Sequence, residues 1–162
     1  MTIPIEPLTK TRFAPFGDVV EAEGARAIPI NQGFATRYDG LASIDVETAG
    51  GAVNISLFTA QPRPSPIDIA LMERHPLGSQ LFAPMQNRPW LVLVCADPTD
   101  ASTYRAFRAS GRQGVNYARN VWHHPLLVLD PDSCFLVVDR TGPGSNLEEV
   151  FLDESQRLTL DP

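Results

Sequence analysis

Apolar and polar positions alternate along much of the chain, in short runs separated by turn residues. Residues 52–60 place Val53, Ile55 and Leu57 on one side of an extended chain and mostly polar residues on the other, which predicts a strand with one buried face. Residues 90–95 are apolar throughout and predict a central strand. Similar runs complete a set of about ten short strands, at residues 18–21, 67–75, 81–83, 103–107, 126–129, 134–138 and 146–152.

Turn residues are spread over the whole length. The 15 prolines and 11 glycines leave room for few and short helices, one of them a single turn within residues 8–16. Residues 28–38 are polar and irregular, which is typical of a surface loop or a lid. Many short strands at this spacing predict a mostly β protein, a sandwich or a barrel.

Length and charge narrow the class of protein. A chain of 162 residues suits a single domain over residues 1–162, with a substantial core. The net charge of −6 argues against a nucleic-acid partner. No apolar run approaches the roughly 20 residues of a membrane helix, and the first residues do not resemble a secretory signal. We therefore expect a cytoplasmic protein in which Cys95 and Cys134 are buried free thiols.

Two polar clusters carry the candidate chemistry, and the first lies at the end of an apolar strand. Residues two apart share a face of an extended strand, so Glu73 and His75 follow Ile69 and Leu71 on one side. An apolar wall that ends in a carboxylate and an imidazole is typical of a small-molecule pocket. The alternative is an exposed strand end without a function.

The second cluster lies within residues 111–125, where turn-forming residues lead into a pair of histidines. If the chain is extended here, Tyr117, Arg119 and His123 face one side and His124 faces the other. An inward arginine beside a histidine suits an anionic substrate, because the guanidinium binds a carboxylate through two hydrogen bonds. The alternatives are a solvated Arg119 and, for His124, a packing role, which we favour.

Both clusters resemble cupin motifs. Glu73, His75 and Gln80 have the spacing of the first motif, H-x-H-x(3,4)-E, with two of its three residues replaced. The run A-R-N-V-W-H, which ends at His123, resembles the second motif, P-x-G-x-x-H. Asn120 stands where that motif has glycine, and asparagine tolerates the left-handed conformation that the glycine would supply. The resemblance implies a cupin-like double-stranded β-helix barrel.

One family is similar over nearly the whole chain. The segments MERHPLGSQLFAP and GVNYARNVWHHPLLVLD resemble signature segments of the ureidoglycolate lyases. The resemblance implies cleavage of ureidoglycolate to glyoxylate and urea in allantoin (purine) catabolism, by a cytoplasmic homodimer. It also implies a divalent metal cofactor, nickel.

The residues suit this chemistry, since cleavage needs a base for the substrate hydroxyl and an acid for the departing nitrogen. The candidates for these catalytic roles are Glu73, His75 and His123. The candidates for substrate binding are Arg119 at the carboxylate and Gln80, Asn116 and Tyr117 at the urea group or the hydroxyl. The candidate metal ligands are His75, Gln80 and His123. Two other functions stay open: a hydrolase that releases ammonia, and a non-catalytic module that binds a small carboxylate.

Overall fold

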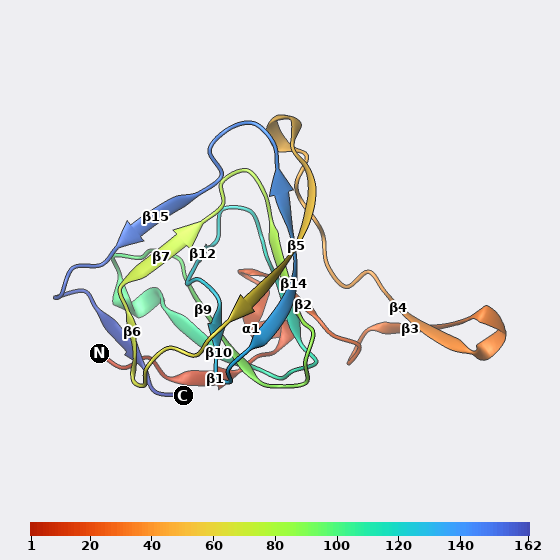
Figure 1. Ribbon diagram of the computed structural model, residues 1–162, viewed down its shortest axis with the longest axis horizontal. Helices are drawn as coiled ribbons and strands as arrows, with labels where there is room; N and C mark the ends of the chain where they lie inside the picture. Colours follow the sequence, from red (N-terminus) through yellow and green to blue (C-terminus); the bar gives the residue numbers. More distant parts are fainter.

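The computed structural model describes residues 1–162, and its two large sheets face each other (Figure 1). Buried apolar side chains fill the space between them. The larger sheet has the order β1-β10-β9-β12-β7-β15, with β13 also paired to β9. It contains β1 (Ile5–Pro7), β7 (Leu71–Arg74), β9 (Trp90–Cys95), β10 (Arg105–Ala109), β12 (Trp122–His123), β13 (Leu127–Val128) and β15 (Glu148–Phe151). All its pairs are antiparallel except β1 with β10.

The second sheet is antiparallel, with the order β2-β11-β8-β14-β5. Its strands are β2 (Gly17–Val20), β5 (Ala52–Ala60), β8 (Gln80–Pro84), β11 (Gly114–Tyr117) and β14 (Ser133–Thr141). Two small sheets complete the fold: β6 (Ile67–Ile69) with β16 (Leu158–Leu160), and the hairpin of β3 (Arg26–Ile30) and β4 (Ala35–Asp39). The helical elements are α1 (Lys10–Phe13), η1 (Asn31–Gly33), η2 (Thr48–Gly50) and η3 (Ala101–Thr103).

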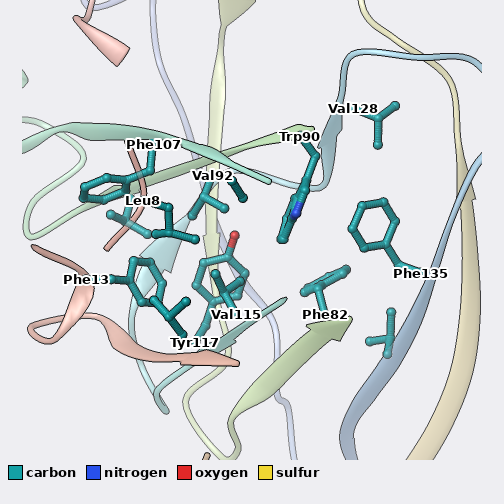
Figure 2. Packing of buried hydrophobic residues seen from close by; sticks show 14 residues of the cluster. Leu8, Phe13, Phe82, Trp90, Val92, Phe107, Val115, Tyr117, Val128 and Phe135 are labelled. Carbon is teal, nitrogen blue, oxygen red and sulfur yellow. The ribbon is translucent and has the colours of Figure 1, made fainter. Parts of the chain in front are cut away.

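Strand β9 is apolar throughout because each of its faces borders a core. Trp90, Val92 and Val94 point between the two large sheets, into the cluster drawn in Figure 2. Leu91 and Leu93 point the other way, into a second core that β6 and β16 cover. The predicted central position of this strand is confirmed, since β10, β12 and β13 all pair with it.

The predicted mostly β, cupin-like architecture with short helices is confirmed, but three local predictions are wrong. Residues 28–38 are not an irregular loop: they form most of the β3–β4 hairpin, which projects from the two sheets in Figure 1. The run 67–75 divides at Ala70, because β6 pairs with β16 whereas β7 pairs with β12 and β15. The third correction concerns β5.

Strand β5 turns its apolar side outward. Val53, Ile55 and Leu57, which the alternation predicts to be buried, are 54, 66 and 61% exposed. They share their face with the half-buried Leu136 and Val138 of β14. The opposite face of β5 carries Asn54 and Ser56, whose register partners on β14 are Asp139 and the core residue Val137. No helix of the protein combines the length and the apolar character that crossing a membrane requires.

Candidate active site between the two sheets

The two polar clusters meet between the large sheets. His123 on β12 pairs in register with Glu73 on β7 and with Val94 on β9. Because Val94 faces the inner core, its register partners His123 and Glu73 face the same way. His75 directly follows β7, and Gln80 begins β8 in the facing sheet. The structure thus brings Glu73, His75, Gln80 and His123 together, as the sequence predicts.

Backbone carbonyls hold the two imidazole rings. The Nδ1 atom of His123 lies 2.9 Å from the carbonyl oxygen of Val121, and Nδ1 of His75 lies 2.7 Å from that of Asn146. A carbonyl only accepts, so each Nδ1 carries the hydrogen and donates it. In a neutral ring each Nε2 therefore presents a lone pair to the space between the sheets.

Several hydrogen-bond acceptor atoms face one another in the space between the sheets. Nε2 of His123 is 3.5 Å from Oε1 of Glu73, and Nε2 of His75 is 3.1 Å from Oε1 of Gln80. The ligand atoms of Glu73, His75 and His123 all lie within 4.8 Å of one another. Nε2 of His123 is buried and has no hydrogen-bond partner. Facing lone pairs repel unless they share a proton or a cation, so the site is built around a positive species.

Tyr117 forms the floor of this cluster. Its ring stacks on the His123 ring, with centroids 4.2 Å apart and planes 11° from parallel. Burial and the charge of Glu73 raise the pKa of the Tyr117 hydroxyl, which stays neutral. The stacking and the Val121 carbonyl together fix the orientation of His123.

Glu73 is the accessible acid of the cluster, with 18% of its side chain exposed. Burial raises the pKa of this carboxyl, but the nearby imidazoles, His123 first, outweigh burial and the net pKa is lowered. Glu73 is thus ionised at neutral pH.

His124 packs away from the cluster, as favoured from the sequence. It is buried, and its Nδ1 bonds the carbonyl oxygen of Pro125 at 2.7 Å. Burial lowers the pKa of His124 to about 4, so this ring is neutral. Its backbone N–H donates to the carbonyl of Leu93 in β9.

Arg119 and Asn116 lie outside the cluster. Residues between β11 and β12 form a turn, so the strand alternation that placed Arg119 beside His123 does not run through them. The Arg119 side chain is 44% exposed and contacts Asp45 at 3.4 Å and Thr48 at 2.8 Å. Asn116 is on the opposite face of β11 from Tyr117, where its amide donates to Asp18. Both residues line one surface hollow of about 320 Å³.

The turn between β11 and β12 has the conformation that the second cupin motif predicts. Asn120 has a φ of 70°, the left-handed conformation that the motif's glycine would supply. The Asn120 N–H donates to the carbonyl oxygen of His75 at 2.9 Å, so the turn ties the two histidine segments together. The contribution of Asn146, whose side chain also accepts from the Leu77 N–H at 2.7 Å, has no signal in the sequence.

The donor set fits a divalent cation. Two imidazole Nε2 atoms, an ionised carboxylate and an amide oxygen are ligands of transition metals, and carbonyls orient both rings from behind. The unpartnered Nε2 of His123 is the observation that tests this fit. No lysine or arginine forms an ion pair or hydrogen bond with the four residues, so positive charge there comes from a proton on a histidine or from a bound cation.

The fold and the cluster define a cupin-like protein with a candidate metal-binding site between its sheets. Comparisons identify the family. The ureidoglycolate lyase family profile matches residues 1–159. A ureidoglycolate lyase from Burkholderia mallei is 55% identical over 161 residues, 99% of this chain and 95% of that protein. One from Pseudomonas syringae pv. tomato is 47% identical over 99% of this chain and 96% of that protein. The chain belongs to the ureidoglycolate lyase family.

Solved structures are more distant. A dTDP sugar isomerase from Desulfovibrio desulfuricans G20 is 20% identical, with a TM-score of 0.47, over 86% of this chain and 87% of that chain. Oxalate decarboxylase from Bacillus subtilis has a TM-score of 0.37 at 15% identity, over 67% of this chain and 29% of that chain.

Proposed function

We propose that this protein is a lyase that cleaves ureidoglycolate to glyoxylate and urea, with residues 1–162 as a single catalytic domain. The observation that carries the proposal is the buried, unpartnered Nε2 of His123 facing the ionised Glu73, in a chain of this family. One carbon of ureidoglycolate bears a hydroxyl, a carboxylate and the ureido nitrogen. The reaction moves one proton from the hydroxyl to that nitrogen and breaks the carbon–nitrogen bond, without consuming water.

Glu73 is placed to carry the proton. Its ionised carboxylate accepts the hydroxyl proton, the oxygen's electrons form the aldehyde, and the carbon–nitrogen electrons stay with the nitrogen. The protonated Glu73 then donates to that nitrogen, which leaves as urea. The carboxyl returns to its starting state, so one residue serves as base and acid in turn.

His75, His123 and Gln80 are the residues that would hold a divalent cation, which would supply Lewis acidity by lowering the pKa of a hydroxyl. A cation also suits the anionic substrate, because Arg119 is engaged with Asp45 instead of the cluster. Nickel, expected from the family resemblance, is our proposed metal.

A product assay tests the activity. We expect urea and glyoxylate in equal amounts from ureidoglycolate. Ammonia in place of urea would make the protein a hydrolase, the alternative open from the sequence. Binding without any product would leave a non-catalytic carboxylate-binding module.

We also propose that the protein is a cytoplasmic homodimer. The outer face of β5 and β14 exposes a contiguous apolar surface, and Phe34 at the tip of the projecting hairpin is 91% exposed. Apolar surfaces of this kind are interaction sites, and a two-fold pair is the commonest way to cover one. Light scattering should give twice 17.7 kDa for the native chain and one chain mass for Leu57→Asp. A native chain that stays monomeric at micromolar concentration contradicts the proposal.

A further inference from the structure

We infer that Asp139, held by Asn54, recognises the terminal amide nitrogen of the substrate's ureido group. This inference rests on the proposed function and adds a specificity-determining residue to the same site. Neither residue belongs to the two clusters that the sequence indicates.

The register of the second sheet brings Asp139 beside the cluster. On β14, Phe135 and Val137 point into the core between the sheets, so the alternation directs Asp139 to the same face. Val138 pairs with Leu81, which makes Asp139 and Gln80 the next opposed positions on β14 and β8. Gln80 in turn contacts His75 at 3.1 Å. The backbone of Asp139 therefore lies about one strand spacing, roughly 4.8 Å, from that of Gln80, the residue of the cluster on β8.

Gln80, Asp139 and Asn54 thus form a row of polar residues across β8, β14 and β5, called the polar row below. Asn54 is the register partner of Asp139 on β5, and its amide donates to Oδ1 of Asp139 at 2.9 Å. This bond fixes the carboxylate, while Oδ2 accepts no hydrogen bond within the chain. Asp139 is half-buried and Asn54 is exposed, so this pair lies at the solvent-accessible end of the polar row, where a ligand can enter.

The chemistry of the two substrate ends decides which end lies here. The carboxylate end is an anion and is repelled by Asp139, whereas the ureido end is uncharged and rich in N–H donors. With the hydroxyl-bearing carbon at Glu73 and the histidines, the ureido group extends toward the next polar position. A fixed carboxylate oxygen accepts an N–H hydrogen bond strongly, because the acceptor is charged.

The experiment compares ureidoglycolate with its analogue dimethylated on the terminal nitrogen, which lacks those N–H donors. The variants are Asp139→Asn, which keeps the shape and removes the charge, and Asn54→Ala, which releases the carboxylate. The matched control is Asp68→Asn, on β6 outside the space between the sheets. Melting temperatures verify that each variant is folded.

For Asp139→Asn we expect KM for ureidoglycolate to rise about ten- to a hundredfold with kcat near that of the native chain, the scale for a hydrogen bond to a charged group. Its KM for the dimethylated analogue should change little, so the preference for ureidoglycolate collapses. Asn54→Ala should shift KM in the same direction by less, and Asp68→Asn should behave as the native chain. Equal losses on both substrates, or no loss on either, would overturn the role of Asp139. A native chain that releases no urea would overturn the proposed function instead.

Discussion

Replacing Glu73 by glutamine should remove most of the turnover and leave the metal-free fold as stable as before, or more stable. The native carboxylate faces Nε2 of His123 at 3.5 Å, and that nitrogen presents a lone pair because Nδ1 donates to Val121. Glutamine has nearly the same shape but offers an N–H, which can donate to the bare Nε2. The substitution therefore satisfies a buried acceptor, whose lack of a partner costs about 1–3 kcal/mol.

For a chain of this size, each kcal/mol corresponds to about 2–4 °C in melting temperature, so the metal-free variant should melt at the native temperature or a few degrees above. The amide cannot accept the hydroxyl proton, and loss of a positioned base typically lowers the rate about 10²–10⁴-fold. The assays are kcat from urea release and calorimetric melting after chelation.

Glu154→Gln is the matched control, because Glu154 is an exposed carboxylate in the turn between β15 and β16, outside both large sheets. It should keep its turnover. A Glu73→Gln enzyme with more than about a tenth of the native kcat would refute the proton-carrying role. A melting temperature lowered by several degrees would refute the account of facing acceptors.

Three further predictions concern neighbouring residues and the metal. His123→Ala should lose about 100-fold or more in turnover, whereas His124→Ala should keep most of it, because His124 is bonded to a carbonyl and faces away; the reverse ranking of folded variants would contradict the site. Arg119→Ala should leave KM near the native value and change the stability by less than about 1 kcal/mol, because its ion pair is half-exposed; a tenfold rise in KM would place Arg119 at the substrate carboxylate. Adding Ni²⁺ to chelated protein should raise the melting temperature, because the metal at 100 times its Kd adds about 2.7 kcal/mol to the free energy of unfolding. His123→Ala should abolish that rise. Equal rises in both proteins would exclude His123 as a ligand.

The sequence predicts that His123 faces the cluster, and it can do so because the position of His123 depends on a local motif. Asn120 adopts a φ of 70°, and the turn leads the chain into β12, where His123 comes three residues after Asn120. Strand alternation predicts Arg119 on the face of His123, but alternation holds only in an uninterrupted strand. The Ala118 N–H donates to Phe16 and the Val121 N–H to Ala118, so a turn separates β11 from β12 and the alternation restarts. Arg119 therefore lies toward Asp45 even though Tyr117 and His123 face each other.

Contacts between distant segments had no signal in the sequence. The alternation in β5 shows that its two faces differ, but not which face the chain covers. The same holds for Asn146, whose carbonyl orients His75 from 71 positions away. Asp139 likewise reaches the site only through the register of β14 against β8 and β5. Pairing of distant strands, not local pattern, decides these placements.

The inverted polarity of β5 connects the two proposals made for this protein. A strand over a closed apolar core would point Val53, Ile55 and Leu57 inward, since burying them contributes more than burying Asn54. Here the opposite face carries Phe58 against the core at one end and, at the other, Asn54, which orients Asp139. The apolar side chains of Val53, Ile55 and Leu57 lie on the outer face, where a second molecule can cover them. A homodimer formed through this face would stabilise the strand that holds the polar row, so Leu57→Asp should weaken substrate binding as well as association.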